Sequence, residues 1–281
     1  MKILILGGDG MLGHVVKYYC QENGYEVLST SREEGKEDFV FDISDTVNHV
    51  SKIIKDANPD VVINCIGILN KATESNRALS ILVNSYFPHY LANISKEMNF
   101  KLIHVSTDCV FKGDKGKYSE TDNPDAQDFY GKTKALGEVV DNHNVTLRTS
   151  IVGPDINPKG VGLFQWFMSQ EGEINGYEKV IWTGVTTLQL AKCMETTIKE
   201  DLTGLQHCVN NDFINKYDLL NLFKEVFNKD IKISQENEHI SEKTLIRTDK
   251  SFDFDIPSYK KMIKEMKEWI GDHKELYPNL I

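Results

Sequence analysis

The stretch Leu4–His14, LILGGDGMLGH, decides the fold. It joins the end of an apolar run, as expected for a buried strand, to the start of a segment with helical spacing. Glycines spaced G-x-x-G-x-x-G allow a tight turn, close approach of the backbone to a pyrophosphate, and close packing of helix on strand. The pyrophosphate then lies against free N–H groups at the helix N-terminus. We therefore predict a dinucleotide-binding turn, although a glycine-rich turn without a ligand would share the pattern. The residues of this turn are Gly7, Gly10, Met11, Leu12 and Gly13.

Similar apolar runs recur through the first 150 residues, at EVLST, VVINC, KLIHVS and VTLRTSIV. They show little alternation of polar and apolar residues, which is typical of strands buried on both faces. Segments with helical spacing lie between them. This order predicts an α/β fold with a doubly wound parallel (Rossmann) sheet covered by helices on both faces.

The strand–helix rhythm becomes irregular after about residue 155. Four segments keep helical spacing, and LQHCVNN and DIKISQ are short candidate strands. We predict an NAD(P)-binding Rossmann domain over residues 1–153 and a smaller mixed α/β substrate lobe over 154–281. The boundary is approximate, because segments of one part can cross into the other. A cleft between the two parts would hold the substrate.

Charge and cysteine content narrow the class of protein. The net charge of −10 disfavours a nucleic-acid or anionic-membrane partner, since both need basic patches. The five cysteines form no C-x-x-C pair, and the histidines show no metal-ligand spacing. No apolar stretch reaches the roughly 18 residues that span a bilayer. We expect a cytoplasmic protein without a metal centre, and leave a homodimer open.

The end of the second apolar run bears on the choice of cofactor. A carboxylate there would bind the ribose 2′-OH and favour NAD, but Ser31 and Arg32 come first, followed by Glu33 and Glu34. Arg32 could pair with a 2′-phosphate, so we expect NADPH to be preferred, with NAD still open. A solvated loop arginine is the other interpretation of Arg32.

The segment FDIS, at residues 41–44, is a candidate contact for the adenine of the cofactor. It offers Asp42 for the edge of the base and Ile43 for its face. A helix N-cap is almost as good an interpretation of Asp42.

A proton-transfer set follows at the end of the strand KLIHVS. Ser106, Thr107 and Asp108 come at the strand end, where doubly wound sheets bind ligands. Tyr130 and Lys134 follow, four residues apart on one face of a predicted helix. A nearby ammonium favours the phenolate and lowers the pKa of the tyrosine, and the threonine hydroxyl can hold the substrate oxygen.

Taken together, these segments resemble the extended short-chain dehydrogenase/reductases. Within that superfamily the chain looks like the dTDP-4-dehydrorhamnose reductase group of nucleotide-sugar 4-keto reductases. The matching pieces cover most of residues 1–153 in the group's order: GGDGMLG, VINCIG, VSTDCVFKGDKGKYSETDNP, FYGKTKALGE and TLRTSIVG. The resemblance implies reduction of the C4 ketone of a nucleotide-linked 4-keto-6-deoxy sugar by NAD(P)H.

The resemblance also implies roles for single residues. Tyr130 would protonate the sugar O4, and Lys134 would lower its pKa and hold the nicotinamide ribose. Thr107, and less so Ser106, would bind the substrate oxygen, beside Asp108. Arg247 lies in a segment that the group uses near the sugar nucleotide; it either pairs with the diphosphate or forms a surface ion pair. Further residues that the resemblance places at the cofactor are Cys65, Ile66, Gly67, Asn84, Ser106, Thr149, Ser150 and Ile151.

Three related functions are alternatives to a 4-keto reductase. Sugar-nucleotide 4,6-dehydratases follow the threonine with Asp-Glu, whereas Asp108 is followed here by Cys109, which argues against dehydration. A 4-epimerase with bound NAD needs the same tyrosine and lysine, so it stays open. A non-catalytic regulatory subunit of the same fold is also open, although the intact Thr107, Tyr130 and Lys134 argue against it.

The sugar is not fixed by the resemblance, because IGILNKATES and VIWTGVTTLQLA depart from the dehydrorhamnose reductase pattern. A UDP-linked N-acetylated 4-keto-6-deoxy sugar of bacterial O-antigen or capsule synthesis is as plausible as dTDP-4-dehydrorhamnose. Trp166 and Phe167 are expected in the core, although either could stack on a base.

Overall fold

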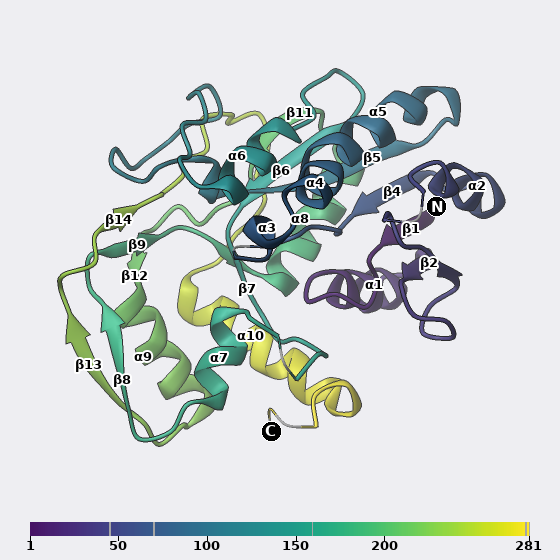
Figure 1. The fold of residues 1–281 in the computed structure, drawn as a ribbon. Coiled ribbons are helices and arrows are strands. Elements are labelled where there is room, and N and C mark those ends of the chain that lie inside the picture. Colours follow the sequence, from purple (N-terminus) through teal and green to yellow (C-terminus); the bar gives the residue numbers. More distant parts are fainter. Residues whose placement is uncertain (45, 70, 159, 279, 281) are drawn as a thin grey trace.

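The computed structural model describes residues 1–44, 46–69, 71–158, 160–278 and 280 (Figure 1). Its centre is a parallel sheet of seven strands in the order β11-β6-β5-β4-β1-β2-β3. This is the doubly wound α/β arrangement expected from the sequence, extended by β11 at one edge. The strands are β1 (Lys2–Leu6), β2 (Glu26–Ser31), β3 (Phe39–Val40), β4 (Val61–Asn64), β5 (Lys101–Thr107), β6 (Val145–Thr149) and β11 (Gly204–His207).

Helices cover both faces of the sheet, because successive side chains of a strand point to opposite faces. Ile3 and Ile5 of β1 join one core, together with α1 (Gly13–Glu22), α8 (Thr187–Lys199) and α10 (Tyr259–Asp272). Leu4 and Leu6 join the other core, which is completed from helices nearer the N-terminus. These helices are α2 (His49–Ala57) and α5 (Phe87–Glu97). Burial on both sides explains why the strands are almost continuously apolar.

Short helical segments bring polar residues to the carboxyl edge of the sheet. The helix α6 (Phe129–Leu136) carries the Tyr130–Lys134 pair, and the 3₁₀ turn η2 (Asp108–Val110) follows β5 directly. The remaining segments of this half are α3 (Lys71–Ser75), α4 (Arg77–Ile81) and the π-helical turn η1 (Leu82–Tyr86).

A smaller lobe is built from short strands and helices, seen at the lower left of Figure 1 around β8, β13 and α9. β8 pairs with β13 in parallel, and β9 pairs with β12 and β14. The lobe contains α7 (Leu163–Ser169), α9 (Lys216–Phe227), β8 (Glu173–Tyr177), β9 (Val180–Trp182), β12 (Ile214–Asn215), β13 (Lys232–Glu236) and β14 (Ser241–Glu242). Two further short strands, β7 (Ile151–Val152) and β10 (Val185–Thr186), pair with each other, and η3 (Lys274–Leu276) follows α10.

The chain crosses between the two parts more than once. After β9 it returns through β10 and α8 to β11, which pairs in parallel with β6 at the edge of the central sheet. α10 then packs into the core that contains α1 and α8. Helix α8 and strand β11 therefore belong to the Rossmann part, α8 packed in its core and β11 within its sheet, although both lie well beyond residue 153.

Across the described parts of the chain, no helix is long and apolar enough to cross a membrane. Those same residues contain no group of three or more His, Cys, Asp or Glu side chains that could hold a metal ion. All five cysteines are free thiols.

Candidate active site

A pocket of about 450 Å³ opens at the carboxyl ends of β1, β4, β5 and β6. This is the edge at which doubly wound sheets bind ligands. It runs from the glycine turn to the start of α6 and gathers most of the site residues expected from the sequence. Those lining it are Gly10, Met11, Leu12, Cys65, Ile66, Gly67, Ser106, Thr107, Asp108, Tyr130, Lys134, Thr149, Ser150 and Ile151.

The glycine turn has the geometry of a phosphate cradle. Gly7 has φ +82°, and its carbonyl oxygen accepts the Gly10 N–H at 3.1 Å. A Cβ on Gly13 would lie 2.0 Å from the Gly7 oxygen, so only glycine lets α1 begin this close to β1. No side chain caps α1, and no acidic residue occupies its first turn. The helix end therefore fits the pyrophosphate of a dinucleotide.

Close packing of α6 against the end of β5 assembles the catalytic set. A Cβ on Gly131 would lie 2.1 Å from the Cys109 carbonyl oxygen, so this glycine brings its neighbour Tyr130 up to the strand end. Asp128 caps the helix by accepting the Gly131 N–H at 2.8 Å. Tyr130 and Thr107 line the same pocket, where the Thr107 hydroxyl donates to Asp108 at 3.1 Å. This placement allows the phenol and the hydroxyl to approach the same substrate oxygen.

The pKa of Tyr130 differs from the expectation. Burial raises this pKa, and the neighbouring Thr107 side chain opposes only part of the increase. The lowering expected from Lys134 is not realised, because the Lys134 ammonium donates to the Val105 carbonyl at 2.7 Å instead. Burial also lowers the pKa of Lys134, to about 8, while Glu138 acts in the opposite direction. In this state Tyr130 is a protonated phenol, which suits an acid rather than a base.

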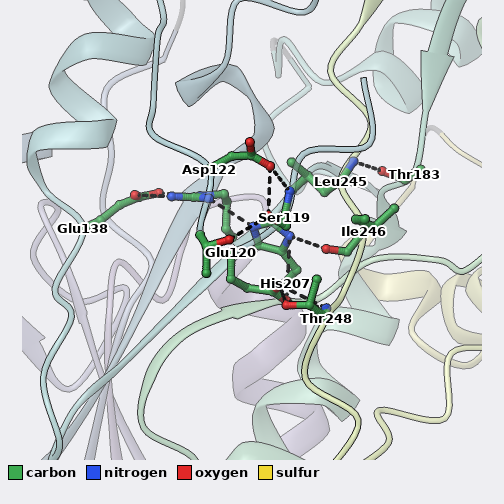
Figure 2. Close-up of polar contacts among 11 residues, drawn as sticks. Ser119, Glu120, Asp122, Glu138, Thr183, His207, Leu245, Ile246 and Thr248 are labelled. Carbon is green, nitrogen blue, oxygen red and sulfur yellow. Dashed lines mark hydrogen bonds and ion pairs between the residues drawn. The ribbon is translucent and has the colours of Figure 1, made fainter. Parts of the chain in front are cut away.

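A buried polar network lies behind the pocket. The Ser106 hydroxyl donates to Glu138 at 2.6 Å, and Glu138 forms an ion pair with Arg148, also at 2.6 Å. Figure 2 shows the part of this network that runs from Glu138 to His207 and Ile246. Arg148 donates from Nη1 to His207 Nε2 at 3.0 Å. Since a guanidinium only donates, His207 carries its proton on Nδ1 and donates it to the Ile246 carbonyl at 2.8 Å. Ser106 is therefore held in place from behind.

Asn84 contributes to the site without lining it. It lies in η1, where its side-chain oxygen accepts the Ile68 N–H and its nitrogen donates to the Ile68 carbonyl, both at 2.9 Å. The same nitrogen reaches the Thr133 hydroxyl of α6 at 3.2 Å. Asn84 thus ties the loop after β4, which carries Cys65 to Gly67, to the helix of Tyr130 and Lys134.

The three residues proposed for the adenosine end lie away from the pocket. Arg32 is exposed at the end of β2, beside Asp42. Asp42 accepts the backbone N–H of Ser44 at 2.8 Å and its hydroxyl at 2.7 Å, so it caps a loop turn. It does not cap α2, whose N-cap is Asn48. Ile43 is buried in the core between the sheet and α2.

Arg247 does not line the described pocket, and it forms an ion pair with an exposed carboxylate. Its Nη2 lies 3.7 Å from Asp253, although the Arg247 side chain itself is only 9% exposed. The guanidinium packs over the rings of Phe252 and Phe254, at 4.7 and 5.5 Å, and its Nη1 has no partner. A buried donor without a partner is compatible with binding an anion, but the pocket does not extend to it.

Several residues of the site were not found from the sequence. Lys216, at the start of α9, acts electrostatically on Asp108, and burial lowers its pKa to about 8. Its ammonium lies 4.7 Å from the Trp182 ring. No motif marks this lysine, because it reaches Asp108 only through the folding of the lobe. Other lining residues that were missed are Asn64, Leu69, Val105, Cys109, Asp155, Val161, Gly162 and Leu163.

The two aromatic residues of α7 differ from each other. Phe167 is fully buried, as expected, whereas Trp166 is 39% exposed and does not belong to the core. Their positions follow from the helix, which buries only one face.

The sheet order, the glycine cradle and the Thr107–Tyr130–Lys134 set together define an extended short-chain dehydrogenase/reductase. The sequence model described as the RmlD substrate binding domain matches residues 1–266, so the chain belongs to that family. The structure resembles that of dTDP-4-dehydrorhamnose reductase from Bacillus anthracis in complex with NADP. The TM-score is 0.82 at 19% identity, over 95% of this chain and 99% of the other, which shows a shared fold.

Two curated relatives match with different coverage. Methionine adenosyltransferase 2 subunit beta of Xenopus tropicalis is 26% identical over 242 residues, which are 81% of this chain and 72% of that protein. dTDP-4-dehydrorhamnose reductase of Mycobacterium tuberculosis is 33% identical over 143 residues. That match covers 49% of this chain and 44% of the reductase, less than half of each.

Proposed function

We propose that the protein reduces the C4 ketone of a nucleotide-linked 4-keto-6-deoxy sugar, with NADPH as hydride donor. The observation that carries this proposal is the placement of Tyr130, Thr107 and Lys134 in one pocket with the glycine cradle. Glycines at positions where a Cβ would collide with backbone support a dinucleotide rather than a featureless turn. The reductases among the relatives and solved structures support the same class of reaction.

Each side chain has a definite task in this proposal. A bound nicotinamide would supply the hydride. Tyr130 holds a proton and gives it to the sugar O4 as the carbonyl is reduced, and Thr107 positions that oxygen by a hydrogen bond. Lys134 lines the same pocket with its ammonium on the Val105 carbonyl, and in this proposal it holds the nicotinamide ribose. Ser106, held by Glu138, gives the strand end a fixed shape.

Substrate identity is open between two classes, dTDP-4-dehydrorhamnose and a UDP-linked N-acetylated 4-keto-6-deoxyhexose of surface polysaccharides. A panel of dTDP- and UDP-linked 4-keto sugars, followed by the loss of NADPH absorbance, decides between them. Titrating NADPH and NADH against the same protein tests the cofactor preference. NAD that remains bound after purification, with epimerisation and no net oxidation, would instead indicate a 4-epimerase.

Replacing Tyr130 with phenylalanine tests the reductase proposal directly. Tyr130→Phe should lower turnover by roughly 10²- to 10⁴-fold, since the proton donor is lost while the ring remains. NADPH binding, measured by calorimetry, should stay nearly unchanged. The exposed Tyr86→Phe is the matched control and should retain full turnover. Near-normal turnover in Tyr130→Phe would refute the assignment.

A second candidate function rests on a relative that matches most of the chain. Because methionine adenosyltransferase 2 subunit beta matches 81% of this chain, a role as a subunit of a larger enzyme is the alternative. The panel of 4-keto sugars distinguishes the two candidate functions. A subunit without catalysis would bind the dinucleotide and turn over none of the sugar panel.

A further inference from the structure

The glycine cradle is supported by a segment more than 260 residues away in sequence. His14, the second residue of α1, is 1% exposed and contacts the turn on one side and the C-terminal segment on the other. Its Nδ1 lies 2.8 Å from the Gly10 carbonyl oxygen, and its Nε2 lies 2.6 Å from the Tyr277 hydroxyl. The ring of His14 meets that of Tyr277 edge-on at 5.6 Å. A single imidazole thus joins the two segments.

The donors and acceptors of this contact are fixed by chemistry. The Gly10 carbonyl can only accept, so His14 carries its proton on Nδ1 and Nε2 accepts from the Tyr277 hydroxyl. The Tyr277 oxygen in turn accepts from the Trp269 indole N–H at 3.4 Å. Burial lowers the pKa of His14 to about 4, so the ring stays neutral near pH 7. Both ring nitrogens of His14 and the hydroxyl of Tyr277 therefore have hydrogen-bond partners.

A second contact joins the other end of α1 to the C-terminal segment. His273, at the end of α10, lies 2.8 Å from the Glu22 carboxylate at the end of α1. Its ring stacks on Trp269 at 4.0 Å. Helix α1 is thus held to the C-terminal segment at both of its ends, so the position of Tyr277 relative to the cradle is well determined.

Fixing the Gly10 carbonyl has a consequence for the next N–H group. The same oxygen also accepts the His14 backbone N–H at 3.1 Å, so two donors hold it. A peptide unit is planar and trans, so the Gly10 C=O and the Met11 N–H point in opposite directions. Holding the carbonyl against the helix therefore fixes the direction of the Met11 N–H, a donor on a residue that lines the pocket.

We infer that His14 and Tyr277 are positioning residues for dinucleotide binding: they lock the Gly10–Met11 peptide in the orientation that receives the pyrophosphate. The inference rests on the proposed function, because it assumes a dinucleotide in this pocket. Neither residue touches the ligand, and both act through the peptide. The C-terminal segment is accordingly part of the cofactor site, although it belongs to no dinucleotide-binding motif.

The test compares two substitutions on the same chain segment. Tyr277→Phe removes the hydroxyl and leaves His14 Nε2 and the Trp269 N–H without partners. NADPH should bind roughly tenfold more weakly to this variant by calorimetry, because the turn loses its support. Tyr259→Phe is the matched control, as it removes a buried hydroxyl from the far end of α10, where it donates to backbone carbonyls of Trp182 and Asp212. Its affinity for NADPH should stay within about twofold of wild type.

A pair of His14 variants keeps the test decisive even if Tyr277→Phe fails to fold. The amide of His14→Asn can place an N–H near the Nδ1 position and keep the bond to Gly10. His14→Gln reaches the Tyr277 side and lacks the donor at Gly10. His14→Asn should therefore bind NADPH more tightly than His14→Gln.

The possible outcomes separate the two claims. Equal NADPH affinity in wild type and Tyr277→Phe, equal weakening in Tyr277→Phe and Tyr259→Phe, or equal affinities of the two His14 variants would each overturn the inference alone. Failure of the wild-type protein to bind either NADPH or NADH would overturn the proposed function, and the inference with it.

Discussion

At the scale of single residues, the buried charge of Lys134 lowers the stability of the folded protein. It is 5% exposed, and its ammonium has the Val105 carbonyl as a hydrogen-bond partner. Burial disfavours the charged form, which lowers the pKa of Lys134 from 10.5 to about 8. Below pH 8 the folded protein holds a desolvated charge at Lys134, and the free energy of unfolding is lowered by the full penalty of burying that charge. A charge in this place serves the chemistry of the pocket rather than the fold.

The pH dependence of this cost has a definite sign. Between pH 8 and 10.5 the unfolded chain binds more protons at this lysine than the folded protein does, so stability rises with pH. We expect the free energy of unfolding of wild type, measured with urea at several pH values, to rise relative to that of Lys134→Met across this window. The relative rise should be at most about 3 kcal/mol. Exposed Lys52→Met, in α2, is the control and should run parallel to wild type. A pH-independent difference for Lys134→Met would contradict the expected cost of burial.

At the scale of elements, α1 depends on how closely it approaches β1. Its first residue, Gly13, packs so tightly on the Gly7 carbonyl that a methyl group has no room. Gly271, near the end of α10, is the opposite case, because a Cβ there meets nothing within 4 Å. Two helical glycines thus serve different purposes: one allows a contact, and the other is replaceable.

The two glycines predict opposite effects of the same substitution. Gly13→Ala should lower the free energy of unfolding by about 1–3 kcal/mol, because the strand-to-helix turn must move. It should also weaken NADPH binding. Gly271→Ala should raise the free energy of unfolding by about 0.5–1 kcal/mol through the helix propensity of alanine. Thermal and urea unfolding measure both, and a Gly13→Ala variant as stable as wild type would contradict the packing argument.

At the scale of the whole molecule, residues 244–248 form a strap that ties the two parts together. Tyr118 exchanges backbone hydrogen bonds with Thr244 and Ile246, both at 2.8 Å. Figure 2 shows His207 reaching the Ile246 carbonyl and Glu120 lying against Thr248. The Glu120 carboxylate accepts the Thr248 N–H at 3.0 Å and its hydroxyl at 2.5 Å. The strap thereby links the buried network behind Ser106 to the surface.

Removing Glu120 should release the strap without unfolding the protein. Glu120→Ala leaves Thr248 without its partner, so trypsin should cleave after Arg247 roughly tenfold faster than in wild type. Glu120→Gln keeps an acceptor oxygen and is the control, with cleavage close to the wild-type rate. Digestion followed by mass spectrometry measures the rates. Equal cleavage in Glu120→Ala and wild type would show that the strap is held by its other contacts alone.

The sequence predicts the central sheet well because each strand carries its own signal. Residues such as Ile3 to Leu6 are buried on both faces, and only a continuous apolar run satisfies both cores. The cradle and the Tyr130–Lys134 pair were predictable for the same reason, since both depend on local spacing. The expected strand at LQHCVNN is present as β11, but its place beside β6 has no local signal.

The residues that the sequence did not reveal act at long range. Lys216 reaches Asp108, and Tyr277 reaches His14, only once the C-terminal elements have packed on the Rossmann sheet. Asp42 and Ile43 lie in a loop turn and in the core, outside the described pocket, so their contact with the adenine stays a prediction. Spacing identifies groups on one element, whereas contacts between elements follow from the tertiary fold.

The position of β11 has a consequence for synthesis of the chain. Until residues 204–207 have left the ribosome, β6 has a partner only on the β5 side, and its other edge presents unpaired N–H and C=O groups. About 50 residues of nascent chain must therefore be made between β6 and the strand that closes this edge, a delay of several seconds at typical elongation rates. During that interval the half-finished sheet is open to pairing with other strands. We therefore expect slower translation of this stretch to lengthen the exposure of the edge of β6 and to lower the yield of folded protein.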